Sequence, residues 1–467
     1  GIFVGYSLEE LLIKLKNYVS NRKDYLVEEV RRLIRMPSIS GTGEGIQETA
    51  EFLRDWIREK LGSEAVLLSY GGHPIVYGRV RSRGLSKVVI YNMYDVQPPD
   101  PLSEWDYPPF EATIAEGKIV GRGAYNTKAG LMCSLLGVEA VKEAAGDIPV
   151  EVVFVLEGEE EIGSLSMPKF IEDKGGELVG SDFVYFAYPS EDVPGKPTIE
   201  LGNKGIVFVE LRVRTSRYDA HSSLGSGLVN PVAVLARVAL ELLDPLAGPK
   251  LGWLESKAVT PTEEDLKYLG DIMEACPLNR VVEEYGVYRT LLTGRDWYIR
   301  MFFRPSVNID GFASGYVGPG TKTITPAEAV MRLDFRLVPN IEPEDAISYL
   351  NEVLEKLKLK DLVEVRVHDS YTWSKTDPRH PAVRTAVETY SMMGLKPYLI
   401  PMMPGSAPSY LFTRVLKLPM ISTGPGHGGR AHAPNEYITL DTVTNLTLYT
   451  ALLIMKTALK SGSGWRS

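Results

Sequence analysis

The sequence predicts an α/β protein in which a mainly parallel sheet domain is interrupted by an inserted α+β domain. The chain has 467 residues, more than the roughly 250–300 that one hydrophobic core usually supports, so two domains are expected. Apolar, β-branched runs such as PVEVVFVL at 149–156 alternate with helical patterns, which is typical of parallel strands covered on both faces. This alternation stops near residue 205 and returns at Pro381.

Residues 1–204 form the first part of the predicted sheet domain. Its expected helices have apolar residues at helical spacing and cover 7–18, 22–36, 49–61 and 127–145. Its expected strands are apolar and cover 75–80, 87–91, 149–156 and 183–187. Because strands alternate with helices, we expect the strands to pair mainly in parallel.

Residues 205–380 form the predicted inserted domain. From Val207 to Val213 apolar and charged residues alternate, as in a strand with one exposed face. The same alternation returns at 330–337 and 363–367, and Pro231 and Pro343 stand at helix starts. Residues 381–467 complete the sheet domain, with expected helices over 382–393 and 440–460 and expected strands over 398–402 and 419–423.

Composition and charge exclude several classes of partner. The net charge is −9 with no basic stripe, which argues against a nucleic-acid partner. The sequence contains no apolar run of the roughly 18 residues needed to span a membrane, so no membrane partner is expected. The two cysteines, Cys133 and Cys276, have no metal-type spacing and are expected to be buried thiols, which suits a cytoplasmic location. Whether Gly1 is a processed terminus stays open.

Polar residues follow several predicted strands, at the edge where open α/β sheets place their chemistry. These candidates are Asp95, Asp106, Asn126, the acidic run 157–161, His221, His427 and His432. Each also has an ordinary structural explanation, because an acidic run after a strand is often a solvated loop and a single His is often a surface or capping residue. The Gly/Pro-rich loop that carries His432 follows a strand, which favours a functional role for this residue.

Eight ordered motifs identify a family resemblance. They are YDVQPPDPLSEWDYPPFEATIAEGKIVGRGA, EGEEEIGS, LGNKG, YDAHSS, GYVGPGTKTITP, RLVPN, PGSAPSYLF and HAPNE. With these motifs the chain resembles the co-catalytic zinc hydrolases that include carnosinase-type dipeptidases, aminoacylases and succinyl-diaminopimelate desuccinylases, and it is most similar to the dipeptidase branch. The resemblance implies a zinc-exopeptidase-like α/β domain, an inserted lid domain and a homodimer formed through the lid.

The family's five metal-ligand positions do not all carry ligands in this chain. The resemblance implies that Glu161 and His432 are retained ligands, whereas the other three positions hold Met93, Asn126 and Tyr188. It also implies that Glu160 is the general base and that Asp95 supports the first His, a position that is Met93 here. Catalytic zinc ordinarily takes three protein ligands. We therefore expect no two-zinc site, and either no metal or a single weakly bound divalent metal.

One alternative would restore a single metal site. If the loop after 183–187 is offset, Glu191 or Asp192 takes the place of Tyr188, and His427 joins from a neighbouring loop. On the substrate side, the resemblance implies that His221 reaches a substrate oxygen, often in the partner's site. It also implies that Thr323, Arg336 and Ser406 bind the carboxylate end, for which a guanidinium is well suited.

Three functional hypotheses follow. In the first, the protein is an inactive or strongly impaired relative of zinc dipeptidases that still binds a small peptide or an acylated amino acid. In the second, it is an active metallopeptidase or amidohydrolase that uses one metal with non-standard ligands. In the third, it is a structural or assembly protein that reuses the dimer surface of the lid.

Overall fold

The main sheet has eight strands, and most of its pairings are parallel, as predicted. The computed structural model describes residues 6–460, so Gly1 lies outside the described residues. In spatial order the strands are β1 (Glu64–Leu68), β2 (Ile75–Val80), β6 (Glu151–Glu157), β3 (Lys87–Met93), β7 (Phe183–Ala187), β20 (Met420–Thr423), β8 (Thr198–Glu200) and β18 (Tyr398–Ile400). β3 pairs in parallel with β6 and β7, and β20 in parallel with β7.

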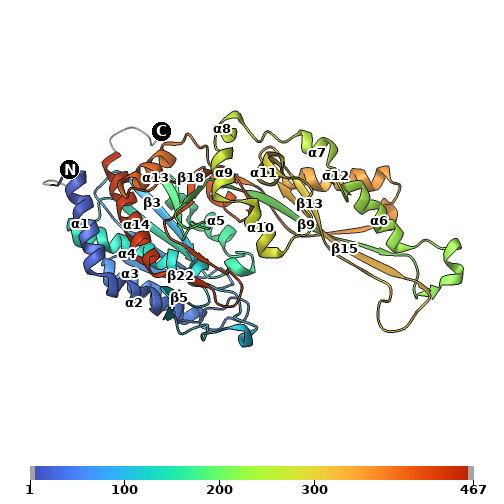
Figure 1. Ribbon diagram of the computed structural model, residues 1–467, viewed down its shortest axis with the longest axis horizontal. Helices are drawn as coiled ribbons and strands as arrows, with labels where there is room; N and C mark the ends of the chain where they lie inside the picture. The colour runs from blue at the N-terminus through green and yellow to red at the C-terminus, as the bar shows by residue number, and fades with distance from the viewer. Residues whose placement is uncertain (1–5, 461–467) are drawn as a thin grey trace.

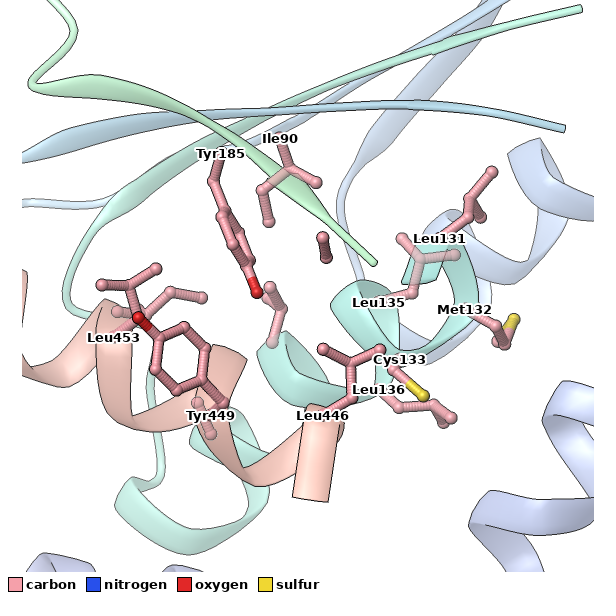
Figure 2. Packing of buried hydrophobic residues seen from close by; sticks show 14 of the residues in the cluster. Ile90, Leu131, Met132, Cys133, Leu135, Leu136, Tyr185, Leu446, Tyr449 and Leu453 are labelled. Atoms are coloured by element: carbon pink, nitrogen blue, oxygen red, sulfur yellow. The ribbon is translucent and has the colours of Figure 1, made fainter. Parts of the chain in front are cut away.

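Helices cover both faces of the main sheet (Figure 1). One face packs against α1 (Leu8–Asn21), α2 (Lys23–Ile34), α3 (Ile46–Leu61), α4 (Ala129–Ala145), α13 (Pro381–Met392) and α14 (Leu440–Lys460). The other face packs against α5 (Met167–Leu178) and the turn η6 (Leu411–Val415). Neighbouring residues of β3 therefore enter different cores: Ile90 contacts the first and Val89 the second. Figure 2 shows Ile90 and Tyr185 above Leu135 and Tyr449 in the first core.

A second sheet extends away from the main sheet (Figure 1). Its antiparallel strands are β13 (Ser306–Ser314), β15 (Glu328–Leu337), β9 (Gly202–Arg214) and β16 (Glu364–Tyr371). The alternation predicted for β9 is confirmed, because Val207, Val209, Leu211 and Val213 are all buried, against α6 (Pro231–Leu242) and α12 (Pro343–Lys356).

One strand belongs to both parts of the molecule. The first residues of β9 pair with β17 (Ser374–Lys375) and β19 (Met403–Ser406), and its later residues pair with β15 and β16. Two glycines permit the close approach: a Cβ on Gly202 would lie 2.5 Å from the Ser374 carbonyl oxygen, and one on Gly205 would lie 2.6 Å from that of Tyr371.

Part of the segment between the two sheets was not predicted. It contains the short helices α7 (Gly252–Ser256), α8 (Glu263–Leu266), α9 (Leu269–Ala275), α10 (Leu278–Tyr285) and α11 (Gly294–Phe303). Of these, α9 and α11 pack on the main sheet, where Ile272 and Phe302 share a core with Ile400. Residues within 205–380 thus contribute to a core of the main sheet as well as to the second sheet.

Several predicted boundaries change. The helix predicted over 127–145 begins at Ala129, because Asn126 and Thr127 have non-helical backbone angles inside the turn η2 (Ala124–Lys128). The strand predicted over 398–402 ends at Ile400. Both cysteines are free, but only Cys133 is fully buried, and Cys276 is partly exposed. No helix within residues 6–460 is long and apolar enough to cross a bilayer.

A small four-stranded sheet stands beside the carboxyl edge of the main sheet. Its order is β21 (Gly428–Gly429), β22 (Tyr437–Thr439), β5 (Lys118–Val120) and β4 (Thr113–Ala115). The loop between β21 and β22 carries His432, and β5 leads into η2 with Asn126. This sheet therefore brings two candidate residues that are far apart in the sequence to the same place.

Candidate functional site

A cavity of about 350 Å³ lies at the carboxyl ends of β3, β7 and β8. Five sequence-predicted positions line it: Met93, Asn126, Glu160, Tyr188 and His432. Each comes from a different strand end or neighbouring loop, as expected for a site in an open α/β sheet. These five positions therefore meet at one edge of the main sheet.

Asn126, Glu161 and His432 form one contact network. The Asn126 amide nitrogen donates to Glu161 Oε1 at 3.0 Å and lies 3.1 Å from His432 Nε2. His432 Nε2 also lies 3.1 Å from Glu161 Oε2, and this contact raises the pKa of His432. Gln97 donates to Glu161 Oε2 at 2.8 Å. An amide thus contacts both side chains that the family resemblance marks as metal ligands.

Met93 and Tyr188 present different chemistry to the cavity. Met93 is buried and offers a neutral thioether. The Tyr188 hydroxyl donates to Glu200 Oε1 at 2.5 Å. Burial and the nearby Glu200 raise the pKa of Tyr188 well above its ordinary value, so this phenol keeps its proton at neutral pH.

Asp95 organises the turn that carries the two site glutamates. Its buried carboxylate accepts hydrogen bonds from the backbone N–H groups of Glu160 at 3.1 Å and Glu161 at 3.0 Å. Burial raises the pKa of Asp95 to about 6. Burial and the neighbouring Glu161 raise the pKa of Glu160 to about 9. These surroundings favour the protonated form of Glu160.

Glu436 has a positioning role that the sequence reasoning missed. Its buried carboxylate accepts hydrogen bonds from Arg122 Nη1 at 2.9 Å and from the backbone N–H groups of Gly123 at 3.0 Å and Tyr125 and Asn126, both at 2.9 Å. Glu436 closes the HAPNE motif, which is the one signal that pointed to it. It holds the loop that places Asn126 beside Glu161.

The alternative metal ligands, His427, Glu191 and Asp192, make other contacts. His427 Nδ1 lies 2.7 Å from the Glu191 carbonyl oxygen, and its Nε2 lies 2.9 Å from the Tyr437 hydroxyl. The Glu191 carboxylate accepts from the Gly195 N–H at 2.6 Å, and Asp192 pairs with Arg280. The offset that would bring these groups into the cavity is therefore not observed. Within the described chain, no three or more His, Cys, Asp or Glu side chains are grouped so that they would hold a metal ion.

The four predicted substrate-binding residues form two separate pairs. Arg336 Nη1 donates to Ser406 Oγ at 2.8 Å, and Arg336 Nε donates to Asp334 at 2.8 Å. The other pair, His221 and Thr323, lies on a short two-stranded ribbon and the loop before it, where the N–H of Ser222 donates to the Thr323 carbonyl at 3.0 Å. This ribbon joins β10 (Ala220–His221) to β14 (Ile324–Thr325). None of the four is among the residues that line the cavity.

Comparison with known proteins assigns the family. A family model described as peptidase family M20/M25/M40 matches residues 89–456. The chain belongs to this family. The resemblance read from the motifs is thereby confirmed at the level of the family.

Relatives in the M20 family match nearly the whole chain. The Cys-Gly metallodipeptidase dug1 of Schizosaccharomyces pombe is 28% identical over 466 residues, which cover 92% of this chain and 95% of the relative. The human Beta-Ala-His dipeptidase is 24% identical over 425 residues, or 84% of this chain and 81% of the relative. The crystal structure of the M20 family metallo-carboxypeptidase Sso-CP2 from Sulfolobus solfataricus has 32% identity and a TM-score of 0.85, and covers 93% of this chain and 99% of that one.

Proposed function

We propose that this M20 family protein binds small peptides or acylated amino acids in the cavity and is inactive or strongly impaired as a hydrolase. Two of the similar proteins are named as a Cys-Gly metallodipeptidase and a Beta-Ala-His dipeptidase, which supports a dipeptide-sized ligand. A cavity of about 350 Å³ is large enough for such a ligand. The observation that carries the proposal is the position of the Asn126 amide between Glu161 and His432.

The residues present do not fit a two-zinc centre. Two cations held about 3.5–4 Å apart need anionic ligands around and between them, and a neutral amide stands at the bridging position as Asn126. The Met93 thioether is a poor zinc ligand, and the Tyr188 phenol is protonated and donates to Glu200. Only Glu161 and His432 remain, fewer than the three protein ligands of a catalytic zinc.

The substrate-binding side supports retention of a ligand. Arg336 and Ser406 are in contact at 2.8 Å, and a guanidinium next to a hydroxyl suits a carboxylate. His221 and Thr323 lie close together at the ribbon of β10 and β14. Pairing of two chains through the second sheet, which the family resemblance implies, is part of the proposal because it would bring these residues to the partner's cavity.

A second candidate function is hydrolysis with one metal. One observation favours it: His432 Nε2 and Glu161 Oε2 lie 3.1 Å apart and offer two ligands. If this candidate holds, a single divalent ion bound by these two side chains will support turnover of a dipeptide.

Metal analysis and hydrolysis assays separate these candidates. The protein is incubated with zinc, cobalt or manganese, freed of excess metal and analysed by mass spectrometry, and the same samples are assayed on Cys-Gly, β-Ala-His and their N-acetylated forms. We expect at most one metal per chain and no turnover above background, with heat of binding in calorimetric titrations. One equivalent of metal with turnover that disappears in Glu161→Gln would establish the second candidate instead.

Two equivalents of zinc together with rapid hydrolysis would overturn the proposal. Absence of any binding heat would remove the ligand-binding part. Light scattering on the same preparation tests the pairing of chains, with a dimer expected. Assemblies far larger than a dimer would favour the structural hypothesis.

A further inference from the structure

Side chains from three neighbouring strands form one wall of the cavity. Strand β3 contributes Tyr91 and Met93, β7 contributes Phe186 with Tyr188 just beyond its end, and β20 contributes Met420. The three strands are neighbours in the main sheet, in the order β3, β7 and β20. Because alternate residues of a strand face the same side of the sheet, these apolar and aromatic side chains form one continuous surface.

The aromatic rings of this wall form a row that reaches the cavity. The ring centroids are 5.1 Å apart between Phe412 and Tyr91, 5.9 Å between Tyr91 and Phe186, and 6.1 Å between Phe186 and Tyr188. Rings at such separations attract one another beyond the effect of the area they bury. Phe412 is buried, whereas Phe186 and Tyr188 are partly exposed and line the cavity. An aromatic ring of a ligand would therefore extend the row.

The two methionines and the size of the cavity also suit a ring. The side chains of Met93 and Met420 are buried, and a thioether makes favourable contacts with aromatic rings. Met93 and Tyr188 stand at positions for which the family resemblance implies metal ligands, so apolar and aromatic groups take the place of charged ones in this wall. The cavity holds about 350 Å³, and an apolar cavity of about 150 Å³ already binds benzene. A benzyl side chain therefore fits together with a peptide group.

Polar side chains line other parts of the cavity. Asn126, Glu160 and His432 come from loops and turns beyond the strand ends, and Glu200 and Asn203 come from β8 and β9. A ligand that combines a ring with hydrogen-bonding groups matches both parts of the cavity. An aromatic amino acid in a peptide or in acylated form has this composition.

We propose that the ligand of this cavity carries an aromatic ring, which packs against Phe186 and Tyr188. The inference rests on the proposed function and narrows it: among small peptides and acylated amino acids, those with an aromatic side chain bind most tightly. The selection comes from contacts between rings and from buried apolar area. It depends neither on a metal ion nor on the charge of a group in the cavity.

Calorimetric titration with matched side chains tests this inference. The full-length protein, treated with EDTA, is titrated with Gly-Phe, glycyl-cyclohexylalanine and Gly-Ala, and with the N-acetylated forms of phenylalanine, cyclohexylalanine and alanine. Cyclohexylalanine has the carbon skeleton of phenylalanine without the π-system. We expect the phenylalanine ligands to bind at least about tenfold more tightly than the alanine ligands, because they bury more apolar area. We expect them to bind about fivefold more tightly than the cyclohexylalanine ligands, because only an aromatic ring makes the contacts of the row.

Two leucine variants remove rings and keep an apolar side chain. Phe186→Leu removes the ring between Tyr91 and Tyr188, and Tyr125→Leu removes a further ring that lines the cavity. We expect Phe186→Leu to reduce the preference for phenylalanine over cyclohexylalanine to less than about twofold, and Tyr125→Leu to reduce it by a smaller factor. The preference over alanine should largely persist in both variants, because the wall stays apolar.

A partly buried phenylalanine outside the cavity provides the matched control. Phe52 lies on α3 and packs against the first core, so Phe52→Leu makes the same change elsewhere and should leave all affinities unchanged. Thermal melting verifies that the three variants are folded. Equal binding of the phenylalanine and cyclohexylalanine ligands, or a preference that both cavity variants leave intact, overturns the aromatic inference and leaves the proposed function standing. If no ligand of either series binds, the proposed function itself fails and the inference fails with it.

Discussion

Glu160 lines the cavity and Glu436 holds a neighbouring loop, and the surroundings of these two glutamates are opposite. Glu436 accepts hydrogen bonds from Arg122 and from three backbone N–H groups, all between 2.9 and 3.0 Å. The Glu160 carboxylate has no donor among the described residues, and its neighbour Glu161 adds like charge. Burial raises the pKa of both, but at Glu436 the surrounding donors oppose this effect.

Glu436 supports the backbone of the site, whereas Glu160 faces the cavity in which a ligand would bind. The loop that Glu436 holds, residues 122–126, donates several hydrogen bonds to its carboxylate, and it places the Asn126 amide beside Glu161. Among the described residues that line the cavity with Glu160, none is Lys or Arg, and His432 is in contact with Glu161. The contacts that support the loop are thus complete, whereas the Glu160 carboxyl group has no hydrogen-bond donor among the described residues, and the following experiments would break or sharpen that contrast.

Restoration of the expected ligands should have the largest effect. In the triple variant Met93→His, Asn126→Asp and Tyr188→Asp, all five metal-ligand positions of the family pattern carry suitable ligands. We expect it to retain two equivalents of zinc by mass spectrometry, because two carboxylates and an imidazole supply both donors and charge. The single variant Asn126→Asp serves as the control and should retain fewer than two equivalents of zinc. Failure of the triple variant to gain zinc would show that the frame is altered as well.

Removal of the Glu436 side chain should have the next largest effect, on the stability of the fold. Glu436→Ala removes four hydrogen bonds and leaves the Arg122 guanidinium buried without its partner. We expect the free energy of unfolding to fall by about 3–5 kcal/mol, measured by urea denaturation. Glu172→Ala on the surface should change it by less than about 0.5 kcal/mol. A loss at Glu436 below about 1 kcal/mol would contradict the role assigned to this residue.

Glu160→Gln should raise the free energy of unfolding, whereas Glu436→Ala lowers it, and the change should be smaller. The folded pKa of Glu160 is raised to about 9, so the folded state holds this proton more tightly than the unfolded state. The native protein therefore loses stability as the pH rises from the ordinary value of about 4.5 toward 9, and the variant does not. We expect the variant to be more stable by on the order of 2 kcal/mol at pH 8, and nearly equal at pH 4.5. Parallel stability curves would show that Glu160 has a counter-charge.

His432 should give the smallest effect. Its contact with Glu161 raises its pKa, so the stabilisation is complete below the ordinary value of 6.5 and is lost as the pH rises through the folded pKa. The side chain is 54% exposed, and solvent screening keeps the effect small. The melting temperature of the native protein should exceed that of His432→Gln at pH 6, with the gap closing by pH 9. If the difference in melting temperature increased with pH, the contact with Glu161 would not stabilise the protonated form of His432.

Sequence reasoning located the site because motifs at strand ends have a defined meaning in an α/β sheet. Met93 and Tyr188 were placed correctly since β3 and β7 are apolar runs whose ends meet at one edge. Glu436 was missed because no local pattern tells which backbone N–H groups a distant carboxylate will accept. The place of Glu200 in the cavity wall was missed because it ends a short strand with no recognisable motif. Its contact with Tyr188 depends on the tertiary fold.

Helices α9 and α11 were missed for a related reason. Both helices are short, and their buried residues share a core with Ile400, which comes roughly a hundred residues later in the sequence. Patterns within a short window identify elements that are covered by their neighbours in sequence. They say little about short helices whose packing partner comes much later.

Strand β9 has a mechanical consequence for the molecule. Strand β9 is hydrogen-bonded to β17 and β19 at its start and to β15 and β16 farther on. One continuous strand therefore connects the second sheet to the part of the molecule that contains the main sheet. Asn203, the second residue of β9, pairs with Ser374 and Met403, so it lies where this strand joins the main lobe. Because Asn203 also lines the cavity, the strand that carries the outer sheet forms part of the cavity wall.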